Sequence, residues 1–264
     1  MKKSININRF LQKKQLIPIG FFLASLCLWQ ILTRVFNIPE YILPSPTAII
    51  LALFEDKLIL LNHTIITTFE AVVGLIIAFF FGILIAFVMN RFKTAADILN
   101  PFLVVSQTVP IIALAPLILI WLGVGIVPKI AIVVLVCFFP ICVNTFTGLK
   151  GVEPEMINLL KVMGASKFTI FREVSLPFAL PQIFSGLKIA ATYSIMGAVI
   201  GEWLGAKSGL GIYMTLVSRS FETSKLFAAI IVIVLLSLLI YSLTELLAYV
   251  LMPWSRHKFK EDLF

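Results

Sequence analysis

Charged residues are scarce in this sequence. Among 264 residues, Lys and Arg account for 21 and Asp and Glu for 13, so that 13% are charged while 60% are hydrophobic. A soluble globular domain carries about 25% charged residues, so this chain has too few charges to cover a surface that faces water on all sides. The mean hydropathy of +1.07 agrees, and we predict that lipid is part of the protein's solvent.

Groups that serve catalysis and metal binding are also few. There are only two histidines, His63 and His257, and both lie outside the apolar stretches. The sequence lacks the HExxH and GxSxG patterns of hydrolases and the GxxxxGK[ST] loop of ATPases. The three cysteines form no CxxC pair, so we expect inert buried thiols. We therefore expect no catalytic residue, bound cofactor or metal, and any ATP hydrolysis would need another chain.

Long apolar stretches dominate what is present. A membrane-spanning helix needs about 20 mostly apolar residues, and only helices satisfy the backbone of such long runs in lipid. The sequence therefore predicts an all-α, polytopic membrane protein with six transmembrane helices. Their expected ranges are Ile17–Phe36, Ile65–Met89, Pro101–Leu122, Val127–Leu149, Ile183–Leu204 and Leu226–Met252.

The basic residues predict the orientation of these spans. With six spans, fifteen Lys and Arg residues fall on the side of the two termini and six on the other side. Because cytoplasmic loops are enriched in Lys and Arg, we expect both termini in the cytoplasm. The basic start and the apolar run Leu16–Thr33 also resemble a signal peptide, but no A-x-A cleavage site follows. An uncleaved first span is the favoured interpretation.

Two loops connecting the spans are long. On the outer side, Thr47–Leu61 follows three prolines and could form a short surface helix. On the cytoplasmic side, residues 150–182 contain Pro154, which suits a first helical position, and Gly164, which is typical of a helix end. Between these two residues, apolar side chains recur at i, i+3, i+4 and i+7, one face of a helix. They are Met156, Leu159, Leu160 and Met163.

A second short helix is expected directly after Gly164. Ser166 can cap it, and we expect Leu176-Pro177 to end it before Pro181 opens the next span. The apolar face of the first short helix needs a partner in water. Packing against the protein's own inner surface and packing against another protein both satisfy this need.

The same loop resembles the EAA loop of binding-protein-dependent ABC importer permeases. That pattern runs Glu-Ala-Ala, three residues, Gly-Ala, about ten residues to Leu-Pro, and a further Pro. Gly164-Ala165, Leu176-Pro177 and Pro181 match it in type and spacing. Asn158-Leu159-Leu160 occupies the Glu-Ala-Ala position but lacks the Glu. The resemblance extends over about Asn62–Met252.

This resemblance implies a type I ABC importer permease fold in the bacterial inner membrane. The implied assembly is a homodimer with cytoplasmic ATPase subunits, which use ATP and Mg, and an extracytoplasmic binding protein. Met156–Gly164 would be the coupling helix, seated in a groove of an ATPase whose closure rocks the spans. The chain would divide into three parts. Residues 1–60 would form the N-terminus, the first span and the outer loop. Residues 61–252 would form the permease core, with the coupling loop at 150–182, and residues 253–264 the cytoplasmic tail.

Polar residues within the spans are candidates for a solute pathway, because they are costly in lipid and often functional. Glu202 lies among small residues that could leave a narrow passage, and Trp203 beside it offers a surface for stacking. Tyr193 and Glu70 complete the candidate set. The alternative for Trp203 is an interfacial belt position, and Glu70 could simply reach the outer headgroups.

The stretch TYSIMGAVIGEWLGAKSGLGIYM, followed by SFETSKLFAAI, narrows the resemblance. It is most similar to the nitrate/sulfonate/taurine-type group, and within it to the branch that imports pyrimidine precursors of thiamine. A hydroxymethylpyrimidine or formylaminopyrimidine type of solute is therefore expected. Alkylsulfonate, taurine and nitrate are the alternatives. A secondary carrier or channel is a different class, but neither an internal repeat nor a filter-like loop is present.

Overall fold

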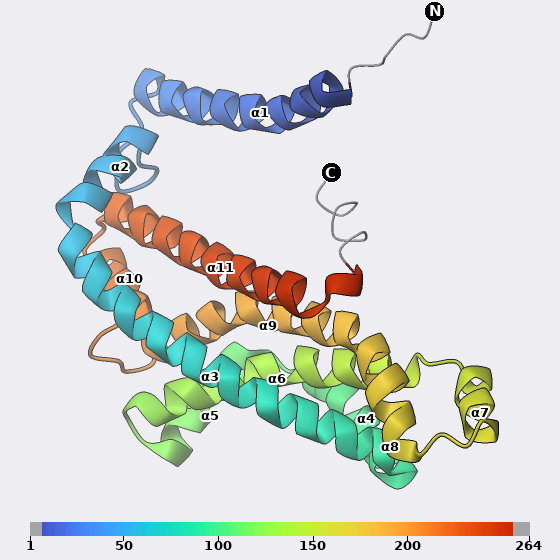
Figure 1. Cartoon of the computed structure of the whole chain (residues 1–264). Coiled ribbons are helices and arrows are strands. Elements are labelled where there is room, and N and C mark those ends of the chain that lie inside the picture. The colour runs from blue at the N-terminus through green and yellow to red at the C-terminus, as the bar shows by residue number, and fades with distance from the viewer. Residues whose placement is uncertain (1–6, 256–264) are drawn as a thin grey trace, which may run out of the picture.

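The structure is a computed structural model and describes residues 7–255. The predicted cytoplasmic positions of residues 1–6 and 256–264 lie outside the described residues. Within residues 7–255 the ordered elements are all helical, as predicted (Figure 1). They are α1 (Ile7–Val35), α2 (Pro46–Glu55), α3 (Lys57–Arg91), α4 (Lys93–Ser106), α5 (Ile111–Leu122), α6 (Ile126–Lys150), α7 (Pro154–Val162), α8 (Lys167–Ile170), a π-helical turn (Phe171–Ser175), α9 (Leu176–Trp203), α10 (Leu210–Arg219), α11 (Thr223–Leu251) and a 3₁₀ turn (Pro253–Ser255).

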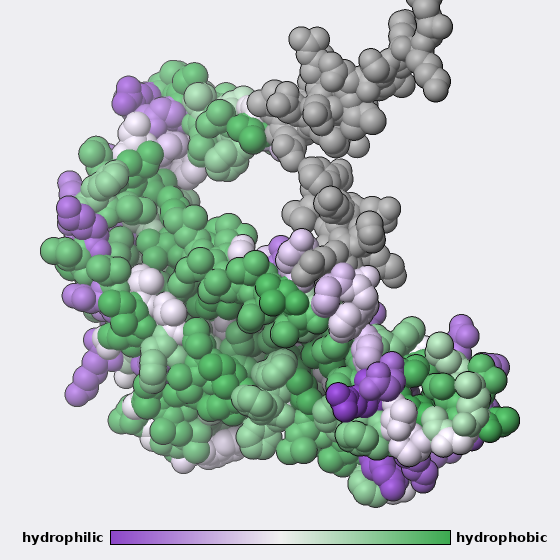
Figure 2. All heavy atoms as spheres, in the orientation of Figure 1, coloured by the Kyte–Doolittle hydropathy of each residue, from purple (hydrophilic) through white to green (hydrophobic). Residues whose placement is uncertain are grey.

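Five helices are long and apolar enough to cross a membrane, and a sixth crossing is made if one bent pair counts as a span. Polar side chains gather at two opposite ends of the molecule, with an apolar band between them (Figure 2). This distribution fits a bundle surrounded by lipid, because hydrocarbon cannot solvate exposed polar groups. The helices α3, α6, α9 and α11 pack side by side, whereas α1 contacts the rest mainly through α2 and its own C-terminal end.

The predicted third span, Pro101–Leu122, is not one helix. It consists of α4 and α5, which meet at an angle of 106° across the break at residues 107–110. Pro110 has no N–H to continue a helix and disfavours helical backbone in the residue before it. Pro101, in contrast, lies within α4 without breaking it.

The expected helix end at Leu176-Pro177 is also wrong. A single helical path runs from Lys167 to Trp203, and Pro177 and Pro181 lie inside it. The π-helical turn Phe171–Ser175 explains this continuity, since the N–H of Leu176 bonds to the carbonyl of Phe171, five residues back. The wider turn relieves the clash that a proline ring makes with the carbonyl four residues before it.

Other boundaries differ from the expected ones for local reasons. The predicted surface helix Thr47–Leu61 exists as α2, which Ser45 caps. It is shorter than predicted, since it ends at Glu55 and the next residues from Lys57 belong to α3. His63 is therefore inside the first helical span of the core and not in a loop. The outer loop before α11 contains α10, which the sequence reading missed. Of the three cysteines, Cys137 and Cys142 are buried, but Cys27 is exposed on α1.

Close packing of α6 against α9 holds the core together. A Cβ added to Gly186 of α9 would lie 2.6 Å from the carbonyl oxygen of Pro140 and 2.8 Å from Cβ of Asn144, both on α6. Gly197 and Gly201 approach Val133 and Lys129 of the same helix in the same way. Small residues are the usual means of bringing helices together in membranes, because lipid gives no hydrophobic driving force between them.

Gly186→Ala should therefore separate α6 from α9 and lower the stability of the chain. The expected loss is about 1–3 kcal/mol, the usual cost of overpacking, and it is measured as a lower midpoint of thermal unfolding in detergent. Gly20→Ala on α1 is the matched control, because nothing lies within 4 Å of the added Cβ there. Equal midpoints for the two variants would contradict the importance of this contact.

Candidate functional site

The short helix α7 stands away from the helical bundle (Figure 1). None of its residues is buried, and Met156, Leu159 and Met163 are 52%, 61% and 73% exposed. The fourth residue of the predicted face, Leu160, is half-buried, while Asn158 is exposed. The apolar ridge is thus not packed against the chain's own bundle, which was one of the two ways to cover it.

The end of α7 is fixed by a glycine, as predicted. Gly164 has a φ of +83°, a left-handed conformation that costs other residues energy. The N–H of Gly164 bonds to the carbonyl of Lys161 at 3.0 Å, and the N–H of Ala165 bonds to that of Leu160 at 2.9 Å. These two bonds form a Schellman motif. Ser166 then caps α8 by accepting from the N–H of Thr169 at 3.1 Å.

The remaining residues of the predicted coupling set lie behind α7 and not on it. Leu176, Pro177 and Pro181 belong to α9, where Leu176 packs in the apolar cluster around Leu149 and Ala179.

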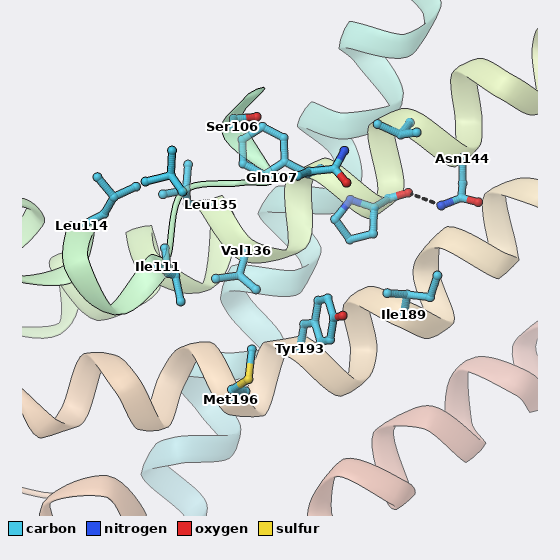
Figure 3. A pocket seen from close by; sticks show the side chains of 14 residues that line it. Ser106, Gln107, Ile111, Leu114, Leu135, Val136, Asn144, Ile189, Tyr193 and Met196 are labelled. Atoms are coloured by element: carbon cyan, nitrogen blue, oxygen red, sulfur yellow. Dashed lines mark hydrogen bonds between the residues drawn. The ribbon is translucent and has the colours of Figure 1, made fainter. Parts of the chain in front are cut away.

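A cavity of about 500 Å³ opens at the break between α4 and α5 (Figure 3). Its walls also include α6 and α9. Most lining side chains are apolar, and the polar ones are Ser106, Gln107, Asn144 and Tyr193. Tyr193 is the one member of the predicted pathway set that lines this cavity. The charged residues of the described chain take no part in its lining.

The other predicted pathway residues lie elsewhere. Glu70 and Glu202 have no exposed surface, and neither lines the cavity. Glu70 forms an ion pair with Lys129 of α6. Glu202 accepts hydrogen bonds from the hydroxyl of Thr67 at 2.7 Å and from the N–H of Gly211 at 2.6 Å. A side chain without exposed surface cannot touch a solute, so in this conformation both carboxylates serve contacts within the chain.

Trp203 does not line the cavity either. It is the last residue of α9 and is 41% exposed. This position suits the interfacial belt that was the alternative to a stacking role. Lys188, near the middle of α9, pairs with Glu245 of α11 at 2.9 Å, so these two charges neutralise each other.

Sequence reasoning missed several residues of these sites. Lys129 is one of the six basic residues that were assigned only to a side of the membrane. Its position near one end of a predicted span matches that of Glu70 and could have suggested an ion pair. Thr67 and His63 gave no signal, because a single Thr or His has many ordinary roles. Gln107 and Asn144 were missed because their shared cavity depends on the bend between α4 and α5. Among residues 7–255, no group of three His, Cys, Asp or Glu side chains could hold a metal ion.

At the end of the bundle that carries α10, this helix and the start of α3 are joined by a further bond. The hydroxyl of Tyr213 donates to a carboxylate oxygen of Asp56 at 2.8 Å. Burial, and then this acceptor, raise the pKa of Tyr213, so the phenol keeps its proton at physiological pH. The ring of Tyr213 also lies 5.6 Å from that of His63.

Known protein families and sequences match most of this chain. Residues 78–256 match the family described as "Binding-protein-dependent transport system inner membrane component". The formylaminopyrimidine transport permease protein ThiX of Halalkalibacterium halodurans is 36% identical over 240 residues, which cover 90% of this chain and 96% of that protein. The putative aliphatic sulfonates transport permease protein SsuC of Bacillus subtilis is 31% identical over 233 residues, covering 87% and 84% respectively.

A solved structure shares the fold. Inward-facing MetNI methionine ABC transporter aligns with a TM-score of 0.60 and 18% identity over 74% of this chain and 96% of that one. The family match extends over more than half of the sequence and contains the α7 loop, the cavity helices, Lys129 and Glu202. The chain therefore belongs to the inner-membrane permease components of binding-protein-dependent ABC importers, and is a non-catalytic membrane subunit.

Proposed function

We propose that this permease subunit imports a small, uncharged heteroaromatic solute of the thiamine pyrimidine precursor type. The observation that carries the proposal is the cavity at the break between α4 and α5. Its polar groups are a hydroxyl, two amides and a phenol, and its other walls are apolar. Such a surface suits a planar ring with hydrogen-bonding nitrogens, since ligand sites combine apolar walls with a few placed polar groups.

The anionic alternatives fit this cavity less well. A sulfonate, taurine or nitrate would leave water for a space whose lining contains no Lys or Arg. Moving an unpaired charge into such surroundings is costly. The similarity to ThiX supports the pyrimidine assignment, while the similarity to SsuC is the reason for testing sulfonates in the same experiment.

We further propose that α7 is the surface that receives ATP-driven movement. Its exposed ridge, Met156, Leu159 and Met163, has the form of an amphipathic helix that lies in a groove of a partner. The partner would be a cytoplasmic ATPase subunit, because the family works with one and this chain lacks a nucleotide-binding loop. The same proposal assigns α7 and both termini to the cytoplasm, and the distribution of Lys and Arg supports it.

A homodimer completes the proposed assembly. The cavity is not fully enclosed by this chain, and one chain offers a single α7 for two ATPase subunits. A second copy related by a two-fold axis would close the pathway and supply the second coupling helix. The extracytoplasmic binding protein would deliver the solute at the end that carries α2 and α10.

The coupling proposal is tested by Gly164→Asp. This change forces an ordinary residue into a left-handed conformation and should disorder the α7 corner at a cost of about 1–2 kcal/mol. We expect normal membrane insertion, loss of co-purification with the ATPase subunit and loss of transport. Gly123→Asp is the matched control: Gly123 has a φ of +74° and open space around it, but it lies between α5 and α6. Wild-type ATPase association in the Gly164→Asp variant would count against the coupling role.

The substrate proposal is tested in two measurements. In a thermal-shift screen, the binding protein of the same transport system should be stabilised by hydroxymethylpyrimidine or formylaminopyrimidine and not by taurine or alkylsulfonates. In proteoliposomes, Tyr193→Phe should lower pyrimidine uptake roughly 2- to 10-fold, the effect of losing one neutral hydrogen bond. Tyr41→Phe, exposed outside the cavity, is the control. If only a sulfonate stabilises the binding protein, the proposed pyrimidine substrate is wrong.

A further inference from the structure

The N-terminus of α10 is capped by side chains from two other helices. A helix leaves its first N–H groups without partners inside the helix, and here three of them find acceptors elsewhere. The N–H of Gly209 donates to Nδ1 of His63 at 2.8 Å, and that of Leu210 donates to the hydroxyl of Thr67 at 2.9 Å. The N–H of Gly211 donates to Glu202 at 2.6 Å. His63 and Thr67 belong to α3, and Glu202 belongs to α9.

Glu202 and Thr67 are also bonded to each other. The hydroxyl of Thr67 donates to the second carboxylate oxygen of Glu202 at 2.7 Å, and both residues have no exposed surface. A carboxylate is favoured at a helix N-terminus, where the unpaired N–H groups carry partial positive charge. Hydrogen bonds to an ionised group are stronger than those between neutral groups. One carboxylate thus joins three helices at a single buried point.

Two glycines at the start of α10, Gly209 and Gly211, lie so close to Glu202 that no larger residue fits at either position. A Cβ on Gly209 would overlap the carboxylate of Glu202, and a Cβ on Gly211 would lie 2.9 Å from Cβ of Glu202. Gly209 also has a φ of +122°. The backbone of α10 therefore approaches Glu202 as closely as a chain without side chains allows. The Tyr213–Asp56 bond holds the same helix to the start of α3 at a second point.

The position of Glu202 connects this point with the opposite end of the molecule. The helical path from Lys167 to Trp203 is continuous, and only residues 163–166 separate it from the end of α7. Packed helices can move as rigid bodies, and a displacement of α7 would then be carried along α9 to Glu202. There it meets α3 and α10 through short, buried hydrogen bonds.

We propose that Glu202 and Thr67 form a latch that makes the outer ends of α3, α9 and α10 move together when α7 moves. Both are positioning residues for transport, since neither reaches the cavity. The proposal rests on the coupling role of α7 proposed above. It differs from a pathway role for Glu202, because the latch needs hydrogen bonding in a fixed geometry and does not need contact with the solute.

The test uses Thr67→Val, which removes the hydroxyl while keeping the shape of the side chain. Thr68→Val is the matched control, because the hydroxyl of Thr68 bonds only to the carbonyl of Thr64 within α3. The complete transporter, with ATPase and binding protein, is reconstituted in proteoliposomes, and solute transported per ATP hydrolysed is measured. We expect Thr67→Val to lower this ratio about tenfold while ATP hydrolysis continues. Thr68→Val should keep the wild-type ratio.

Two variants of Glu202 separate the latch from a pathway role. Glu202→Ala should lower the ratio as Thr67→Val does. Glu202→Gln should keep at least half of it, because an amide can accept from Gly211 and donate to Thr67. The Thr67 hydroxyl can then donate to the carbonyl of His63, which lies 3.1 Å away. If Glu202→Gln loses transport as completely as Glu202→Ala, the charge itself is required and the latch proposal is wrong.

A measurement without transport keeps this proposal distinct from the proposed function. Hydrogen exchange of the peptide containing residues 209–211 in the purified chain should be about tenfold faster in Thr67→Val than in Thr68→Val. Unchanged exchange together with an unchanged transport ratio would overturn the latch. If Glu202→Ala does not assemble, Thr67→Val carries the test alone. Failure of the coupling proposal appears instead in the Gly164→Asp variant, whatever the exchange result.

Discussion

Close contact between α6 and α9 is the constraint on which the rest of the structure depends. In lipid, apolar side chains gain little by leaving their solvent for one another, so helices must associate through fit and polar bonds. Gly186, Gly197 and Gly201 let the backbone of α9 lie directly against α6. Gly74 and Gly82 of α3 meet the other side of α6 in the same way, against Val133 and Ile141. The three helices thus form a rigid core.

That core determines where polar groups can be placed. The ion pair between Glu70 and Lys129 bridges α3 and α6, and the pair between Lys188 and Glu245 joins the middle of α9 to α11. Each pair neutralises charges that would be costly alone in a membrane. The cavity lies beside the bent α4 and α5, where non-helical backbone can face a space and not lipid.

Function follows from the way α9 joins the two ends. At one end of α9, the exposed helix α7 is connected through a turn at Gly164. At the other end, the buried carboxylate of Glu202 accepts a hydrogen bond from the N-terminus of α10. A π-helical turn lets this helix pass two prolines without ending. Under the proposed coupling, movement of α7 would therefore have a continuous helical route past the cavity to α10. Rigid-body motion of packed helices is a common way of changing access to a site.

The sequence by itself determined the class of protein, most of its spans and the short amphipathic helix that ends at Gly164. Apolar length, the distribution of Lys and Arg, and Gly164 act locally, so their consequences can be read along the chain. Tertiary structure alone decided the roles of Glu202, Glu70 and Tyr193. Glu202 became a helix cap because α10 folds back onto it, and Tyr193 faces the cavity because α4 and α5 bend apart. Such partners lie far apart in sequence, and only the packing of helices brings them within hydrogen-bonding distance.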